Sequence, residues 1–273
     1  MQAPLFLSLI MVTVLVTTSC SPGESHSAPT ASATGLTAAQ KQKIGRKIWQ
    51  NESNGTVEGL TMWNEGEEFP SLGIGHFIWY PPGFNGRFNE TWPQFVSHAR
   101  RKGVEMPAVA YEADCPWRTK AEFQREFRGE KMSSLRNWLA NNISIQTDFI
   151  VTRSQGALGK ILAAVPAGSR ERIQANYRKV ASTGNGTYAL IDYVNFKGDG
   201  TKQSERYNGQ GWGLLQVLEG MKDVPAGQPA AKEFAASAKR ALDRRIANSP
   251  PGRGESRWRA GWHNRCNTYA QPL

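Results

Sequence analysis

Five glutamates lie in the stretch from Ile48 to Tyr80, which reads IWQNESNGTVEGLTMWNEGEEFPSLGIGHFIWY. Cleavage of a glycosidic bond needs a carboxylic acid that protonates the leaving oxygen, and a second group that holds water or stabilises positive charge at the anomeric carbon. The pattern indicates that Glu52 is the acid and that a carboxylate of the following loop faces it across a cleft. The loop carboxylates are Glu58, Glu65, Glu67 and Glu68.

The surroundings of Glu52 suit a proton donor. A general acid must stay protonated near neutral pH, and burial against apolar groups achieves this by raising the pKa of a carboxyl. Glu52 follows Ile48 and Trp49, so we expect it to lie against apolar side chains. Gly73 and Gly75 allow substrate or backbone to approach closely.

The tetrapeptide Gly-Ile-Gly-His at 73–76 completes a segment that resembles the catalytic region of phage-type lysozymes, in the lysozyme-like superfamily. In those enzymes a catalytic Glu ends the first long helix, an acidic residue and a Thr follow on a small hairpin, and Gly-Ile-Gly-His closes it. The resemblance covers residues 48–80 and implies that Glu52 is the acid, Glu65 the second acidic residue and Ser71 the counterpart of the Thr. The chain differs in having Glu for the usual Asp, Ser for Thr and a longer loop.

His76 has a structural role in this interpretation. On a strand from Leu72 to Tyr80, its side chain shares a face with Ile74 and Ile78. We therefore expect His76 in the core, paired with a buried acid.

Aromatic and amide side chains provide candidate contacts to sugar, because rings stack on pyranose faces and amides bond to hydroxyls. Residues 211–216, Gly-Trp-Gly-Leu-Leu-Gln, faintly resemble the Gly-Leu-Met-Gln of lytic transglycosylases; the alternative is a tight glycine-rich start of a helix with a buried Trp. The candidate substrate-binding residues are Trp63, Asn208, Gln210, Trp212 and Gln216, with Asp192 and Asn195 as additional polar groups of the cleft.

The elements that position these residues follow from caps and periodicity. Thr37 is an N-cap for a helix through Asn51, and Thr119 with Glu122 forms a capping-box pattern. Ser169 is the expected cap of a helix to Ala181, and residues 212–221 and 234–246 show helical apolar spacing. The order predicts an α+β, lysozyme-like fold, mostly helical with a small antiparallel sheet after the first helix, in a single domain over 37–273.

The N-terminal residues predict an export signal. Residues 5–16 form a short apolar run, and small residues precede Cys20, as in a bacterial lipobox. We expect a signal peptide at 1–19, a lipidated Cys20 and a flexible tether at 20–36. By resemblance to bacterial lipoproteins, Ser21 favours the outer membrane, facing the periplasm. The alternative is an ordinary secretory signal and a periplasmic protein.

Export changes the interpretation of the cysteines. With Cys20 lipidated, Cys115 and Cys266 are left, and two thiols in an oxidising compartment can pair. We expect a Cys115–Cys266 disulfide; the alternative is two unrelated thiols. No Cys or His spacing suggests zinc, and no cofactor is expected.

Length and composition limit the class of protein. The chain has 273 residues, a formal net charge of +10, and 27 Gly, 15 Pro and 9 Trp, which argues against coiled coils and simple bundles. No apolar run reaches the roughly 18–20 residues that cross a membrane. The basic charge favours an anionic partner. Arg and Trp alternate in residues 253–265, which suits wall polymers or Arg stems packed over Trp rings, whereas an exported protein rarely meets nucleic acid.

These features predict a monomeric lipoprotein that cleaves a β-1,4 amino-sugar glycan, with peptidoglycan as the expected substrate. Glu65, with Ser71, orients the attacking water, which gives hydrolysis with inversion. A lytic transglycosylase, in which Glu52 acts alone, and a chitosanase-like hydrolase are alternative enzymes. A lipoprotein that binds peptidoglycan without cleaving it is the alternative from another class.

Overall fold

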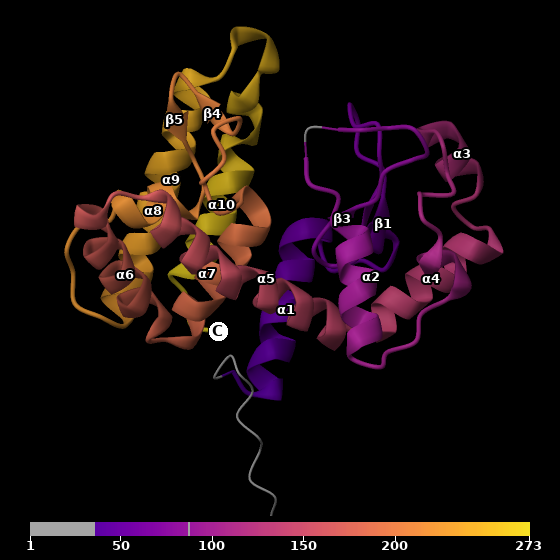
Figure 1. The fold of residues 1–273 in the computed structure, drawn as a ribbon, viewed down its shortest axis with the longest axis horizontal. Helices are drawn as coiled ribbons and strands as arrows, with labels where there is room; N and C mark the ends of the chain where they lie inside the picture. Colours follow the sequence, from indigo (N-terminus) through magenta and orange to yellow (C-terminus); the bar gives the residue numbers. More distant parts are fainter. Residues whose placement is uncertain (1–35, 87) are drawn as a thin grey trace, which may run out of the picture. The chain divides into compact units, whose positions relative to one another are not determined.

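The described residues, 36–86 and 88–273 of a computed structural model, are mostly helical, with a small three-stranded sheet in the first half and a two-stranded sheet in the second (Figure 1). The α+β class, with mostly helix and a small antiparallel sheet after the first helix, is confirmed at this level. All described residues belong to one compact unit. The predicted signal peptide, Cys20 and all of the tether except Leu36 lie outside the described residues.

Helix α1 (Ala38–Ser53) begins where the sequence predicts. The Thr37 hydroxyl accepts a hydrogen bond from the Gln40 backbone N–H, and the Gln40 side chain accepts one from the Thr37 N–H, which is a capping box. Ile44 and Ile48 are buried on one face. Asn54, in the left-handed region at φ 53°, ends the helix, so that Glu52 lies in its last turn.

The first sheet has the order β1 (Thr61–Met62), β2 (Ser71–Leu72) and β3 (Phe77–Ile78), with both pairs antiparallel. Ser71 lies opposite Met62 and Ile78 in the register. The predicted continuous strand from Leu72 to Tyr80 is wrong, because residues 73–76 form the turn between β2 and β3.

Backbone conformation explains that turn. Gly73 has φ 69° and His76 has φ 48°, a left-handed conformation that interrupts a strand. The turn is fixed by hydrogen bonds from the Gly73 N–H to the Leu60 carbonyl (2.8 Å) and from the Ile74 N–H to the Gln146 side chain (3.0 Å). Gln146 is fully buried, so the turn is held against the core. His76 is therefore not on a strand face.

Aromatic side chains fill the core around this sheet. Trp79 stacks on Trp92, with ring centroids 5.3 Å apart, and Phe77 stacks on Phe95 at 4.7 Å. The Thr119 hydroxyl caps α3 as predicted, by accepting from the Glu122 N–H. The helices here are α2 (Trp92–Arg101), α3 (Lys120–Arg125), α4 (Glu130–Asn141) and α5 (Ile143–Ala164).

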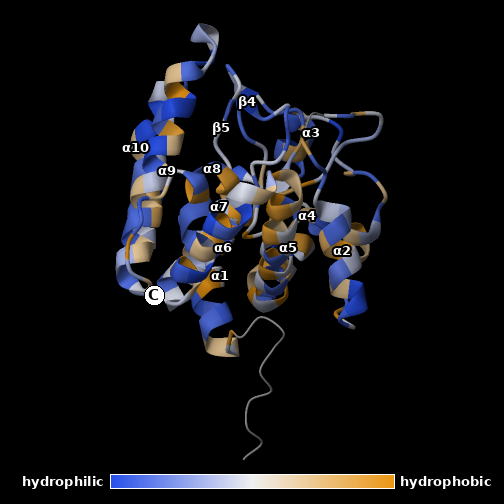
Figure 2. Ribbon diagram, turned by 60° about the vertical axis from the view of Figure 1, so that its left-hand side comes forward, coloured by the Kyte–Doolittle hydropathy of each residue, from blue (hydrophilic) through white to orange (hydrophobic). Residues whose placement is uncertain are grey.

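Helix α5 packs on α1 and also contacts α2, α6 and α7 (Figure 1). Many of its residues are hydrophobic and buried, among them Phe149, Ile150 and Ile161 (Figure 2). Among the described residues, none of the helices combines the length and apolar character that a membrane crossing needs.

The second half of the chain supplies the helices that complete the site. Helix α6 starts at Ala167, directly after Pro166, rather than at the predicted cap Ser169; the φ of Pro166, −56°, already leads the chain into the helix. The elements after α5 are α6 (Ala167–Ala181), α7 (Gly184–Lys197), β4 (Arg206–Tyr207), β5 (Gln210–Gly211), α8 (Leu214–Glu219), α9 (Gln228–Asn248) and α10 (Arg259–Tyr269).

Candidate active site

Glu52 is held by side chains from three other elements. Its Oε1 accepts hydrogen bonds from Arg265 Nη2 on α10 (2.7 Å) and from Asn195 Nδ2 on α7 (3.1 Å). Its Oε2 lies 3.4 Å from His76 Nδ1 on the turn between β2 and β3. The side chain is 12 % exposed. One carboxylate is thus fixed where the first helix, the turn and two later helices meet.

A second carboxylate fixes Arg265. Asp192 on α7 is completely buried and accepts from Arg265 Nε and Nη2, each at 2.8 Å. The Tyr269 hydroxyl also donates to Asp192, at 2.6 Å. This two-bond geometry sets the plane of the guanidinium, so that Nη2 reaches Glu52. Asn195 and Asp192, expected as extra polar groups of the cleft, therefore both lie at this site.

The charges around Glu52 favour its ionised form. Burial raises the pKa of the Glu52 carboxyl, but the charge and hydrogen bond of Arg265 and the charge of His76 outweigh it, so the pKa lies below its ordinary value of 4.5. The expectation that burial keeps Glu52 protonated is wrong for the free protein. The reason is the Arg265 guanidinium, which is in contact with the carboxylate.

His76 pairs with an acid, as expected, and that acid is Glu52, but the His76 side chain is 20 % exposed and so lies at the edge of the core rather than in it. Its other ring nitrogen, Nε2, is buried and has no hydrogen-bond partner within the described part of the chain. A left-handed backbone at a residue other than glycine costs free energy. The turn therefore holds the imidazole against Glu52 at the expense of an unsatisfied nitrogen and a strained backbone.

Glu65 and Ser71 lie elsewhere on the hairpin. Glu65 is exposed on the turn between β1 and β2, and within residues 36–86 and 88–273 it has no hydrogen bond or ion pair. Ser71 is buried on β2. Within the described residues, neither side chain forms a hydrogen bond or ion pair with Glu52, whose polar partners are Arg265, Asn195 and His76.

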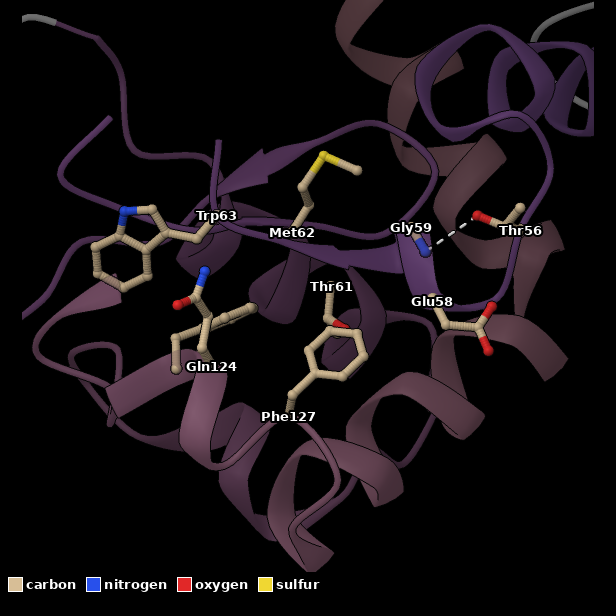
Figure 3. Close-up of a pocket in the computed structure, with 9 residues that line it drawn as sticks. Thr56, Glu58, Gly59, Thr61, Met62, Trp63, Gln124 and Phe127 are labelled. Carbon is tan, nitrogen blue, oxygen red and sulfur yellow. Dashed lines mark hydrogen bonds between the residues drawn. The ribbon is translucent and has the colours of Figure 1, made fainter. Parts of the chain in front are cut away.

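Trp63 lines a cavity of about 340 Å³ beside the loop that follows α1. In Figure 3, Trp63 and Gln124 lie toward one end of the cavity, and Thr56 and Glu58 toward the other. The indole N–H of Trp63 donates to the Glu67 carbonyl at 2.7 Å. The ring is therefore fixed in orientation. The full lining is Thr56, Glu58, Gly59, Thr61, Met62, Trp63, Phe123, Gln124 and Phe127.

Two of the other candidate substrate residues are exposed. Asn208 donates to Asn248 at 3.1 Å, and Gln210 lies on β5. In contrast, the Gln216 amide is occupied by the backbone: it accepts from the Gly213 N–H and donates to the Gly200 carbonyl. Trp212 is buried. This corresponds to the alternative of a tight glycine-rich start of a helix with a buried Trp.

Trp212 and the C-terminal run share one set of cation–π contacts. The Arg245 guanidinium lies 4.2 Å from the Trp212 ring centroid and 5.0 Å from that of Trp262. It also forms a two-bond ion pair with the buried Glu255. Within residues 253–265, the Arg257 guanidinium lies 4.6 Å from the Trp258 ring centroid, so the packing of Arg over Trp rings, one of the two interpretations of this run, is present.

The predicted Cys115–Cys266 disulfide is wrong: both cysteines are free and buried. Cys115 lies in the loop after the first sheet, where its N–H donates to the Tyr80 carbonyl and its thiol to the Trp117 carbonyl. Cys266 lies on α10, which packs on α9 and α7. Burial raises the pKa of each thiol to about 12, so both are inert side chains of separate parts of the core.

Sequence reasoning missed Arg265 as the partner of Glu52 and Asp192. Arg265 and Tyr269 are four residues apart, which is a helical spacing, but this spacing does not identify Glu52 or Asp192 as the partner of Arg265. In the part of the chain that the structure describes, no cluster of His, Cys, Asp and Glu could hold a metal ion.

Comparison with known proteins gives no match: no family model, no curated protein and no solved structure is similar to the chain.

Proposed function

We propose that the protein is a lysozyme-like enzyme that cleaves a β-1,4 amino-sugar glycan, with peptidoglycan as its substrate and Glu52 as the proton donor. The observation that carries this proposal is the fixed position of Glu52. The carboxyl at the end of the first helix contacts His76 of the Gly-Ile-Gly-His turn, while Arg265 and Asn195 hold its other oxygen.

Binding of substrate supplies the protonated form of Glu52. The free carboxylate is ionised because of Arg265 and His76. A glycan strand that covers Glu52 excludes water and strengthens the effect of burial, which raises the pKa of the carboxyl. Arg265 opposes this rise less than a free cation would, because Asp192 neutralises the same guanidinium. Protonation is thereby coupled to occupation of the site.

In the hydrolytic mechanism, Glu52 gives its proton to the glycosidic oxygen as the bond from that oxygen to the anomeric carbon breaks. A water molecule attacks the anomeric carbon from the opposite face and loses its proton to Glu65, so that the configuration inverts. Glu65 is the proposed base because its carboxylate lies on the exposed turn of the hairpin and has no ion pair among the described residues, with Ser71 on the adjoining strand.

One observation favours a transglycosylase as the second candidate. Within the described residues, the polar contacts of Glu52 include no second carboxylate. In that mechanism Glu52 first protonates the leaving oxygen. The C6 hydroxyl of the same sugar then attacks the anomeric carbon and returns its proton to Glu52, which leaves a 1,6-anhydro end.

Mass analysis of digested peptidoglycan separates these candidates. Reducing ends identify a hydrolase and anhydro ends a transglycosylase, whereas chitosan cleavage without peptidoglycan cleavage identifies a chitosanase-like enzyme. Binding to peptidoglycan without any product would refute the enzyme proposal and identify the non-catalytic lipoprotein.

The Glu52→Gln variant tests the assignment of the acid. It keeps the size of the side chain and removes the proton, so cleavage should fall about 10²–10⁴-fold. Glu171→Gln, at an exposed position on α6, is the matched control and should keep wild-type activity. Glu65→Gln should lower the cleavage rate by a similar factor if the protein is a hydrolase, and should leave the rate nearly unchanged if it is a transglycosylase. Full activity of Glu52→Gln on every glycan that the native protein cleaves would show that Glu52 is not the acid.

The cellular site is part of the same proposal: an outer-membrane lipoprotein anchored at Cys20 and facing the periplasm. Cys20→Ser should release the protein from the membrane fraction. Unchanged fractionation, with no acyl mass on the mature N-terminus, would contradict the anchor.

A further inference from the structure

Lys197, the last residue of α7, contacts two aromatic rings. Its ammonium nitrogen lies 3.9 Å from the ring centroid of Phe196 and 3.9 Å from that of Trp262. The side chain is half-buried, and so are both rings. Throughout residues 36–86 and 88–273, Lys197 forms no hydrogen bond or ion pair with a carboxylate. A cation so placed has ring faces around it but no anion.

The two arginines whose charges act on Lys197 have anions of their own. Arg265 is bound to Asp192 and Glu52, and Arg245 is bound to Glu255. Burial lowers the pKa of Lys197 well below its ordinary value, and the charges of Arg245 and Arg265 lower it further, whereas Glu255 and Glu52 oppose the change only from a distance. The free protein therefore holds Lys197 in a site that is unfavourable for its charge, and an added anion would relieve this.

Lys197 is linked to the catalytic carboxyl through Phe196 and Arg265. The Arg265 guanidinium, which donates to Glu52, lies 4.1 Å from the centroid of the same Phe196 ring that Lys197 contacts. Lys197 and Glu52 are also close enough for each charge to act on the other. A ligand that reaches Glu52 thus meets the same Arg265–Phe196 cluster that Lys197 contacts.

We propose that Lys197 binds a carboxylate carried by the glycan beside the bond that Glu52 protonates, so that the enzyme selects acidic amino-sugar strands over neutral ones. An ammonium offers the N–H donors that a carboxylate accepts. This inference rests on the proposed function for the position of the strand, and it adds the class of substituent that the strand must carry.

Binding of two matched ligands tests the proposal. The first is short denuded peptidoglycan strands with free lactyl carboxylates, and the second is the same strands after carbodiimide activation and borohydride reduction of those carboxylates to alcohols. Calorimetry on the full chain carrying Glu52→Gln measures binding without cleavage. We expect the acidic strands to bind about 10–100-fold more tightly, as is typical for one charged hydrogen bond.

Variants then assign the preference to Lys197. Lys197→Met keeps the apolar stem between the rings and should reduce the preference to about 1, whereas Lys197→Arg should keep it. Lys160→Met, at an exposed position on α5, is the matched control and should keep it too. Equal thermal midpoints for Lys197→Met and the parent protein establish that the fold is intact; if Lys197→Met unfolds, Lys197→Gln takes its place.

The outcomes separate this inference from the function on which it rests. Equal affinity for acidic and reduced strands, or a preference that survives loss of Lys197, would overturn it even if the wild-type protein cleaves glycans. A preference that depends on Lys197 in a protein that cleaves nothing would keep the binding site and reject the enzyme. Strands with intact stem peptides identify which carboxylate is bound, because their lactyl groups are amidated and only the peptide carboxylates are free. If these strands bind more tightly than the reduced strands, and the difference depends on Lys197, the carboxylate belongs to the peptide.

Discussion

Loss of Arg265 should destabilise the protein strongly, because Asp192 depends on it. Asp192 is 0 % exposed and receives two hydrogen bonds from Arg265 and one from Tyr269. In the Arg265→Met variant the apolar side chain fills most of the space, but the carboxylate stays buried without its cation. Breaking a buried ion pair from one side costs about 3–5 kcal/mol, which is a large part of the roughly 5–15 kcal/mol that stabilises a typical domain.

Equilibrium unfolding in urea at neutral pH, followed by tryptophan fluorescence, measures this loss. Arg259→Met removes a similar pair, Arg259 with Asp243, whose side chains are 57 % and 37 % exposed; because water screens such pairs, it should leave stability nearly unchanged. Adding Asp192→Asn to Arg265→Met removes the orphaned charge and should recover at least half of the loss. A loss for Arg265→Met no larger than for Arg259→Met would refute the reasoning that the buried pair is interdependent.

Three further predictions follow from other contacts. The pKa values of Glu52, Glu255 and Asp148 are lowered in the folded protein. These carboxylates therefore stabilise the fold fully above their ordinary pKa values, 4.5 for Glu and 3.8 for Asp, and the stabilisation is lost as the pH falls through the lowered values. The urea midpoint should decline over a series of acidic pH values, and a midpoint that rises on acidification would contradict this. Thiol labelling without reductant should leave Cys115 and Cys266 unmodified in the native protein and should modify both after denaturation. If neither cysteine reacts in the denatured chain, the two are joined by a disulfide and the assignment of free thiols is wrong. Gly213→Ala should lower stability by about 1–3 kcal/mol, because its Cβ would lie 2.3 Å from the Gly200 nitrogen; Gly184→Ala, which meets nothing within 4 Å, is the control in thermal unfolding, and equal midpoints for the two would refute the clash.

Local signals in the sequence predicted local structure well. Thr37 and Gln40 determine where α1 begins, and apolar spacing places Glu52 in its last turn, so that this part of the site followed from neighbouring residues alone. The strand predicted over 72–80 failed for a local reason. Alternating apolar residues resemble a strand, but the positive φ of Gly73 and His76 converts that segment into a turn.

The partners of Glu52 could not be predicted, because they depend on tertiary packing. The sequence indicates Asn195 and Asp192 as polar groups of the cleft, but not that Arg265, which lies in a run of Arg and Trp, is the side chain that joins them to Glu52. The cysteines failed for the same reason. Two leftover thiols suggest a bond, yet only the fold reveals that Cys115 packs near the first sheet and Cys266 on α10.

The contact between Glu52 and Arg265 joins positions 213 residues apart in the chain. Contacts of such long sequence separation form slowly, because the intervening chain must be ordered first. During synthesis, a nascent chain that has not yet exposed α10 carries Glu52 without its guanidinium and Asp192 without its cation. The site is therefore completed only when the last helix docks, and an unfinished or C-terminally clipped chain holds a different arrangement of charges from the finished protein.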